Sequence, residues 1–287
     1  MKKLIPTLAG LWLNILAVIS PRRAAQYGID LFCHPMRQPL TAKHMTFLDS
    51  AEKSTFEHQH INIQTYKWGE GEHKVLFLHG WQSHSYRWKK YIESFDKKQY
   101  TLYALDAPGH GLSGGKYLSV PSYAEVIRAF TMKYSAVDVV VCHSMGCFAA
   151  LYAFYQHPAI TPKVLIALAS PGEAEEFFTH YTKLLSLSAR TTRLLRAKFT
   201  EVFKKTPAEF SAPLFSASLK IPGLLIHDEE DDDTSVEHSK RIHAAWKSST
   251  LMVTKGLGHN LRSAGIVKKV VAFVQETIQQ RVMGYES

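Results

Sequence analysis

The sequence predicts an α/β protein in which helices cover both faces of a doubly wound, mostly parallel sheet of about eight strands. Short, continuous apolar runs rich in β-branched residues alternate with helical stretches from residue 75 onward. A continuous run of this kind is typical of a strand buried on both faces, and repeated β-α units form parallel sheets. Between Gly172 and Leu219 the strand pattern stops and apolar residues recur at helical spacing, which predicts a helical lid insertion.

Composition places the chain among ordinary globular proteins. It has 287 residues, 46% hydrophobic and 21% charged, with a formal net charge of +9. Three cysteines are too few for a disulfide framework and lack the spacing of a metal site. No nucleic-acid recognition motif accompanies the positive charge. We therefore expect a cytoplasmic protein that binds no nucleic acid, with membrane association or export as the alternative.

That alternative rests on the N-terminal helical segment, residues 1–40. Leu4 to Ile19 is an apolar stretch with helical spacing, but Pro21-Arg22-Arg23 stand where a signal peptidase would need small uncharged residues. An amphipathic helix that lies on the domain or on a membrane surface fits better. A second helix is predicted from Arg22 to Cys33, followed by a proline-containing linker.

The core is predicted to comprise residues 50–171 and 220–287, and the lid residues 172–219. Phe56–Glu57 and Ile61–Tyr66 alternate as paired edge strands would, and Val75–Leu78 is the first buried strand. Further strands are predicted at Tyr100–Leu105, Val137–Cys142, Val164–Ala169, Gly223–His227 and Thr250–Thr254. Helices are predicted at Tyr123–Tyr134, Gly146–Gln156, Ser235–Trp246 and Ile266–Gln280.

Ser144 stands at the turn between the strand ending at Cys142 and the helix starting at Gly146. Such a turn strains its central residue, needs small neighbours, and raises the hydroxyl to the carboxyl end of the sheet beside a helix N-terminus. This is where a nucleophile would be placed. The turn resembles the nucleophile elbow G-x-S-x-G of the α/β-hydrolase family, with Cys142 in place of the first glycine.

Other motifs extend the resemblance over residues 60–280. His79-Gly80-Trp81 follows the first buried strand, and Asp106-Ala-Pro-Gly-His-Gly-Leu-Ser113 matches the family's D-x-P-G-H-G-x-S loop. The resemblance implies an oxyanion hole formed by the backbone N–H groups of Trp81 and Met145. It also implies that the D-x-P-G-H-G-x-S loop is structural rather than catalytic.

A serine nucleophile needs a base and a carboxylate that orients the base. His259 is the expected base, because it follows the last strand in the flexible sequence Gly256-Leu-Gly-His and completes the order serine, acid, histidine. His143, beside the serine, is assigned to packing.

The acid should follow the strand ending at His227, where residues 228–233 are all acidic. The family frame His-Asp-x-x-Asp, with a Glu-His pair further on, favours Asp231. Asp233 is the next candidate and Glu173 a more distant one, because Thr234-Ser235 replace the family's usual Val-Pro. The acidic run lacks the spacing of a calcium loop. A serine, histidine and carboxylate mechanism requires no metal or organic cofactor, so we expect none.

These residues predict a serine hydrolase acting on carboxylic esters or thioesters through an acyl-enzyme on Ser144. Lactone hydrolysis, carbon–carbon bond hydrolysis, acyl transfer, and a catalytically silent binding protein of the same fold stay open as alternatives.

In the lid, Phe177, Phe178 and Leu194 are expected to contact a small acyl substrate. The stretch from His180 to Lys205 holds seven basic residues and one acidic residue, which indicates either a solvated helix face or a site for an anionic group. The oligomeric state is left open. The expected partners are the substrate and, through the first helix, a membrane surface.

Overall fold

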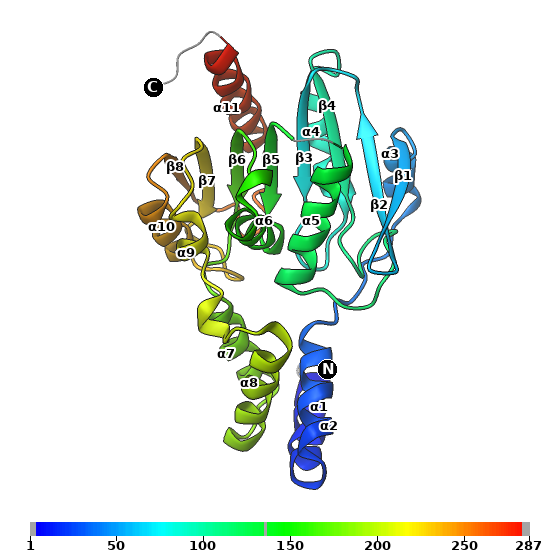
Figure 1. The fold of residues 1–287 in the computed structure, drawn as a ribbon, viewed down its shortest axis with the longest axis vertical. Coiled ribbons are helices and arrows are strands. Elements are labelled where there is room, and N and C mark those ends of the chain that lie inside the picture. Colours follow the sequence, from blue (N-terminus) through cyan, green and yellow to red (C-terminus); the bar gives the residue numbers. More distant parts are fainter. Residues whose placement is uncertain (1–3, 135–136, 283–287) are drawn as a thin grey trace. The chain divides into compact units, whose positions relative to one another are not determined.

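The computed structural model describes residues 4–134 and 137–282 (Figure 1). The chain divides into two compact units. We call residues 35–172 and 212–287 the sheet unit, and residues 1–34 and 173–211 the helical unit. Among the described residues, no helix combines the length and apolar character that a transmembrane span requires.

The sheet unit contains eight strands in the order β1-β2-β4-β3-β5-β6-β7-β8. The strands β1 (Glu52–His58) and β2 (Ile61–Trp68) pair antiparallel, and β2 pairs antiparallel with β4 (Tyr100–Leu105). All later pairings are parallel. They join β3 (His73–Leu78), β5 (Val139–His143), β6 (Val164–Leu168), β7 (Gly223–Asp228) and β8 (Ser249–Thr254). The predicted α/β fold with a mostly parallel sheet is confirmed.

Helices cover both faces of this sheet (Figure 1). On one face, α3 (Ala42–Leu48), α4 (Lys89–Ser94) and α11 (Ala264–Val282) pack on alternate strand residues such as Phe77, Val141 and Ile226. The other face carries α5 (Val120–Tyr134), α6 (Met145–Gln156), α9 (Ala212–Ser216) and α10 (Val236–Ala245). Because both faces are covered, the central strands are buried and mostly apolar, with polar residues such as His143 and Asp228 at their carboxyl ends.

The short helices α3 and α4 were absent from the sequence prediction. The helix α3 begins with a capping box, in which the Thr41 side chain accepts from the His44 backbone and the His44 side chain accepts from the Thr41 backbone. Sequence rules look for Glu or Gln at the third helical position, so histidine in that role gives no standard signal. The short helix α4 follows a 3-10 turn (Ser85–Trp88) and contributes its buried Tyr91 and Ile92 to the core.

The helical unit contains α1 (Leu4–Ile19), α2 (Pro21–Phe32), α7 (Ala174–Leu184) and α8 (Ala189–Phe203). Sequence analysis treated the N-terminal segment and the insertion as separate. In the structure they pack together, and the Tyr181 hydroxyl donates to the Gly28 carbonyl (2.8 Å). Asn14 bridges α1 to the turn before α8, donating to Ser186 and accepting from Ser188.

Small residues allow this close packing. A Cβ on Gly10 would lie 1.6 Å from the Leu185 carbonyl oxygen, and one on Gly28 would lie 2.7 Å from the Leu195 side chain. Helix axes that approach so closely tolerate only glycine at the crossing points. The N-terminal helices and the insertion are distant in sequence, and no local sequence pattern predicts that they pack together.

Candidate active site

Ser144 occupies a strained turn between β5 and α6. Its backbone has φ 51° and ψ −124°, a conformation that residues with a side chain rarely adopt. The neighbouring glycines make room for the turn. A Cβ on Gly146 would lie 2.6 Å from the carbonyl oxygens of Leu78 and His79, and one on Gly80 would lie 2.9 Å from the Ser144 Cβ. This is the geometry of a nucleophile elbow.

Cys142 fills the place of the missing first glycine without disturbing the elbow. Its side chain is fully buried, and its Sγ donates to the Ile166 carbonyl of the adjacent strand β6 (3.3 Å). Burial raises the pKa of this thiol well above its ordinary value, as does its neighbour Cys147. Cys142 is therefore an inert packing residue.

His259 and Asp231 meet on neighbouring loops beyond the sheet. The loop after β8 carries His259, whose Nδ1 lies 2.8 Å from Oδ2 of Asp231 on the loop after β7. A carboxylate at Nδ1 holds an imidazole with its proton on that nitrogen and leaves Nε2 to accept a proton. His259 is thus oriented as a general base would be.

Asp231 is held by several donors at once. Its Oδ1 accepts from the backbone N–H groups of Asp233 and Thr234, and its Oδ2 accepts from the Thr234 hydroxyl (3.0 Å). His227 Nε2 approaches the same Oδ2 at 3.2 Å. Burial by itself would raise the pKa of Asp231, but the hydrogen bonds from His227, His259 and the Thr234 amide outweigh it and lower the pKa well below its usual range. Asp231 therefore stays ionised.

The other members of the acidic run have different surroundings. The buried Asp228 accepts from the Leu257 amide and the Thr254 hydroxyl, and so shapes the loop that carries His259. The Asp233 side chain is exposed. Ligand atoms of Asp231, Asp233 and His259 lie within 4.8 Å of one another, so these three are the described residues able to share a metal ion. Asp231 and His259 already form a hydrogen bond with each other.

Sequence reasoning missed the role of Thr234, although its departure from the usual valine is visible in the sequence. Its hydroxyl donates to Asp231 and lies 3.2 Å from His259 Nδ1. Thr234, which replaces the family's usual valine and left the position of the acid in doubt, thus supplies a further hydrogen-bond donor to Asp231.

His143 does more than pack. Its Nε2 donates to the backbone carbonyl of His259 (2.8 Å), and the two rings meet edge to face with centroids 4.8 Å apart. Burial lowers the pKa of His143 well below its ordinary value, and the charges of Arg87 and His259 add to this effect. Arg87 donates to the Asn260 carbonyl (2.8 Å). His143 and Arg87 thus clamp the loop at two successive carbonyls, and sequence reasoning assigned neither of them this role.

The two backbone amides expected in an oxyanion hole lie at the elbow. Met145 begins α6, and Trp81 follows Gly80, whose backbone abuts Ser144. Within residues 4–134 and 137–282, neither amide donates a hydrogen bond to another protein group. Both amides are therefore available to a ligand oxygen.

The loop Asp106–Gly114 is hydrogen-bonded to the segment that follows Trp81. Asp106 is buried and accepts from Ser85, from the Tyr66 hydroxyl and from the Leu112 amide. His110 Nε2 accepts from the Gln82 amide (3.0 Å), next to Trp81. Burial lowers the pKa of His110 to about 3, so its ring remains a neutral acceptor.

Arg37, which sequence analysis left within a linker, fastens the same loop. Its guanidinium donates to the carbonyls of Ser113 (2.8 Å) and Gly111 (2.5 Å). The signal that could have revealed this role was a single arginine between two prolines, which is too common to be informative.

The predicted substrate contacts in the insertion have mixed outcomes. Phe178 is 1% exposed and packs inside the helical unit against Phe32 and Phe199, with ring centroids 6.2 and 6.0 Å away. Its burial removes Phe178 from the candidates for substrate contact. Phe177 and Leu194 are half-buried, and their role stays a prediction.

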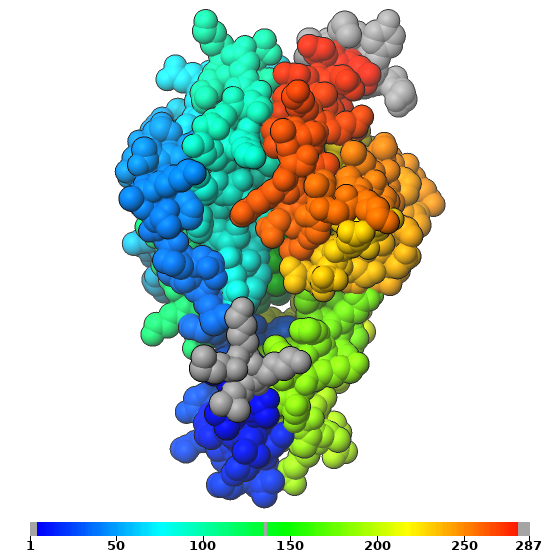
Figure 2. All heavy atoms as spheres, turned by 180° about the vertical axis from the view of Figure 1, so that it is seen from behind, coloured from blue at the N-terminus to red at the C-terminus, as the bar shows by residue number. Residues whose placement is uncertain are grey.

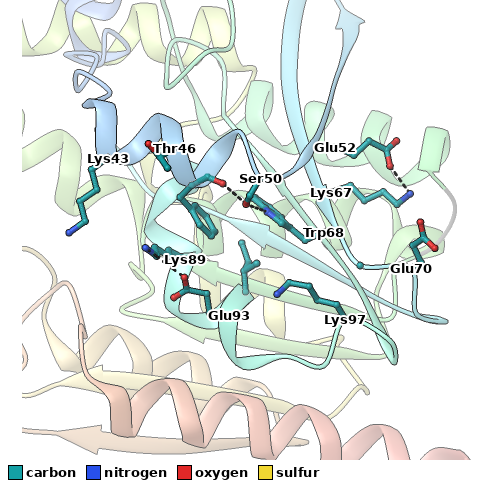
Figure 3. A pocket seen from close by; sticks show the side chains of 13 residues that line it. Lys43, Thr46, Ser50, Glu52, Lys67, Trp68, Glu70, Lys89, Glu93 and Lys97 are labelled. Carbon is teal, nitrogen blue, oxygen red and sulfur yellow. Dashed lines mark hydrogen bonds and ion pairs between the residues drawn. The ribbon is translucent and has the colours of Figure 1, made fainter.

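A surface hollow of about 710 Å³ lies on β2, α3 and α4 of the sheet unit (Figure 3). Trp68 and Phe47 line it together with ion pairs, Lys67 with Glu52 (2.9 Å) and Lys89 with Glu93 (3.6 Å). The Trp68 Nε1 donates to Ser50 Oγ. None of the predicted site residues lines this hollow, and four of its seven charged residues form these two ion pairs.

Comparison with known proteins identifies the family of this chain. The family model described as "Serine aminopeptidase, S33" matches residues 69–213, just over half of the chain. The protein belongs to this family of α/β hydrolases. The matched region contains the elbow, the Trp81 loop and the Asp106–Gly114 loop.

This chain matches different shares of the length of its relatives. A monoacylglycerol lipase of Mycolicibacterium smegmatis is 26% identical over 229 residues, 65% of this chain and 81% of that protein. A probable lysophospholipase, BODYGUARD 1 of Arabidopsis thaliana, is 27% identical over 137 residues, 45% of this chain and 29% of the relative. The chain thus spans less than a third of the plant protein.

Solved structures show the same fold. A putative lipase from Acinetobacter baumannii superposes with a TM-score of 0.65, covering 85% of this chain and 99% of the other at 17% identity. At this identity the likeness concerns the fold alone.

Proposed function

We propose that the protein is a serine esterase that hydrolyses carboxylic esters, with thioesters as the second substrate class. The single observation that carries this proposal is the His259 Nδ1 to Asp231 Oδ2 contact of 2.8 Å, formed on loops that follow β8 and β7. The strained Ser144 and two unengaged amides complete a set of groups suited to acyl transfer.

The proposed reaction has two halves. Ser144 Oγ attacks the acyl carbon while His259 Nε2 takes its proton, and the Met145 and Trp81 amides stabilise the oxyanion. The intermediate collapses to an acyl-enzyme as His259 gives that proton to the leaving alcohol or thiol. Water then attacks the acyl carbon, again losing a proton to His259, and the carboxylic acid leaves with Ser144 restored.

The names of the relatives favour lipid-like esters among the candidate substrates. The relatives described above are named as a monoacylglycerol lipase and a probable lysophospholipase. The family description names an aminopeptidase, so peptide amides are the alternative substrate. Both reactions would use the same nucleophile and oxyanion hole and would differ in the leaving group.

The first test is mass-spectrometric mapping of a fluorophosphonate adduct. We expect one adduct, on Ser144, that is lost in Ser144→Ala and His259→Ala. His60→Ala is the matched control, because His60 is a fully solvated histidine far from these loops in sequence. Folded protein that takes up no label would contradict the proposal and favour a silent binding protein.

A substrate panel then separates the reaction classes. It comprises p-nitrophenyl butyrate and laurate, a monoacylglycerol, a butyryl thioester and alanine p-nitroanilide. We expect hydrolysis of the esters to exceed that of the anilide. Preference for the anilide would establish a peptidase, and labelling of Ser144 without turnover of any ester or thioester would exclude the proposed substrates.

A further inference from the structure

Helix α1 carries an exposed apolar stripe. Over 16 residues it contains no charged side chain. The stripe is formed by residues spaced alternately three and four apart, so that they lie along one face, and each is between 50% and 75% exposed. We define the stripe as Ile5, Leu8, Trp12, Ile15 and Ile19.

The opposite face of α1 is the one that packs. Gly10, Leu13 and Ala17 are buried, and the Gly10 backbone lies against the Leu185 carbonyl at the end of α7. Arg190 of α8 donates to the Ala17 carbonyl (3.2 Å). The packing face is therefore already occupied within the helical unit, and the stripe is left on the surface. Figure 2 shows the first two helices, in dark blue, as part of the molecular surface.

An exposed apolar patch of this kind on a protein surface marks a site that binds another protein, a ligand or a membrane. The described helix is about 24 Å long at 1.5 Å per residue, shorter than the roughly 30 Å of a bilayer's hydrocarbon core. It is suited to lie in the plane of a membrane surface rather than to cross it. The half-exposed rings of Trp12 and Tyr27, with centroids 5.4 Å apart, are of the type that prefers the lipid–water interface.

Basic residues flank this stripe in the sequence. In the sequence, Lys2 and Lys3 precede α1, and Arg22 and Arg23, both exposed, follow it. The helical unit holds 11 Lys and Arg residues against six Asp and Glu residues within 73 positions. The 214 residues of the sheet unit hold 23 and 19. The excess of positive charge is thus concentrated in the unit that carries the apolar stripe.

We propose that this stripe docks the protein in the surface of an anionic lipid bilayer. The apolar side chains enter the headgroup region, and Arg22 and Arg23 in the first turn of α2 bind lipid phosphates. The spacing of the stripe would also suit a second copy of α1. Both ends of the helix are basic, however, so parallel and antiparallel pairs alike would bring cations together. An anionic surface instead gains from the same charges.

The test is co-sedimentation of the full chain with vesicles of phosphatidylcholine alone or with about 30 mol% phosphatidylglycerol at low salt. We expect wild type to bind the anionic vesicles. Ile15→Glu with Ile19→Glu should lower the partition coefficient about tenfold or more, since two apolar anchors are lost and two carboxylates face the lipid. Arg22→Gln with Arg23→Gln should lower it about 30-fold and reduce the preference for anionic lipid.

The matched control is Met36→Glu with Met132→Glu. Both methionines are exposed side chains of the sheet unit, 67% and 69%, so the pair adds the same two carboxylates outside the helical unit. This variant should bind within about twofold of wild type, because it keeps every residue of the stripe and both arginines. Circular dichroism confirms that each variant is folded.

Brominated phosphatidylcholine in the anionic vesicles locates the inserted segment. Tryptophan fluorescence of bound wild type should be quenched, and Trp12→Phe should lose most of the quenching while still binding.

Three outcomes would overturn the proposal. One is wild type that does not bind anionic vesicles, and another is equal binding by the Ile15→Glu with Ile19→Glu pair. The third is a dimer by light scattering that this pair dissociates, without vesicle binding, which would identify a second copy as the occupant. All three are independent of whether Ser144 is labelled.

Discussion

The sheet unit and the helical unit place their polar and apolar groups in opposite ways. The sheet unit buries Asp106, His79, His110, His143 and Asp228 and supplies hydrogen bonds to each of them. The helical unit buries few polar side chains and leaves a row of large apolar ones in solvent. In the sheet unit, buried polar residues hold loops in place, while in the helical unit exposed apolar residues form a surface.

This difference explains why motifs occur only in the sheet unit. A buried polar group must find a partner of fixed geometry, which restricts the residue type at both ends of each hydrogen bond. A surface stripe needs only apolar character at helical spacing, which many sequences provide. The contrast between the units leads to four predictions.

The largest expected effect separates Asp231 from its acidic neighbours. Asp231→Asn should lower kcat by about 10,000-fold, because an amide at this position can no longer stabilise the His259 imidazolium. Asp233→Asn is the control and should change kcat less than about threefold, since the Asp233 side chain is exposed. Steady-state rates on p-nitrophenyl butyrate measure both. Equal losses in the two variants would leave the assignment of the acid without support.

The next effect concerns the packing of the helical unit. Gly10→Ala places a methyl group against the Leu185 carbonyl and should destabilise the attachment of α1 by about 3 kcal/mol. Hydrogen exchange should show lost protection in α1 and unchanged protection in β5 and β6. Gly265→Ala in α11 is the control, because its Cβ would meet nothing closer than 3.5 Å. Full protection of α1 in Gly10→Ala would show that the crossing is looser than described.

A smaller effect tests the histidine beside the nucleophile. His143→Ala should lower kcat by about 10- to 100-fold with KM nearly unchanged, because the loop that carries His259 loses its donor and the base shifts. His143→Gln keeps an N–H donor and should recover part of the rate. Fluorophosphonate labelling rates should follow kcat. A variant that loses thermal stability but keeps kcat would limit His143 to packing.

The last prediction concerns the pH dependence of stability. The pKa of His110 is about 3 in the folded state against about 6.5 when unfolded. Below pH 6.5 the unfolded chain takes up a proton that the native ring refuses, so stability falls with decreasing pH until about pH 3. Each such histidine contributes about 1.4 kcal/mol per pH unit.

Urea unfolding between pH 6 and 4 measures this slope. His110→Gln should reduce it by the share of one histidine, whereas the exposed His60→Gln should leave it unchanged. An unaltered slope in His110→Gln would mean that the native ring is protonated over this range.

Sequence patterns located nearly all of the sheet. The strands β4 to β7 were predicted to within two residues at either end, because apolar runs buried on both faces have a signal that does not depend on their neighbours. The short helices α3 and α4 were missed, since their few core residues form no periodic pattern. The association of the N-terminal helices with the insertion was not predicted, because the two segments are distant in sequence and meet only in the folded structure.

The sequence by itself determined the fold class, the elbow at Ser144, and the loops on which a base and an acid should lie. Each of these is a local constraint on backbone shape or burial, so it leaves a mark within a few neighbouring residues. Only the tertiary structure decided which of six carboxyl groups reaches His259, that His143 holds the His259 loop, and that Phe178 is buried. Those outcomes depend on loops far apart in sequence meeting at distances of about 3 Å, and no short stretch of sequence contains that information.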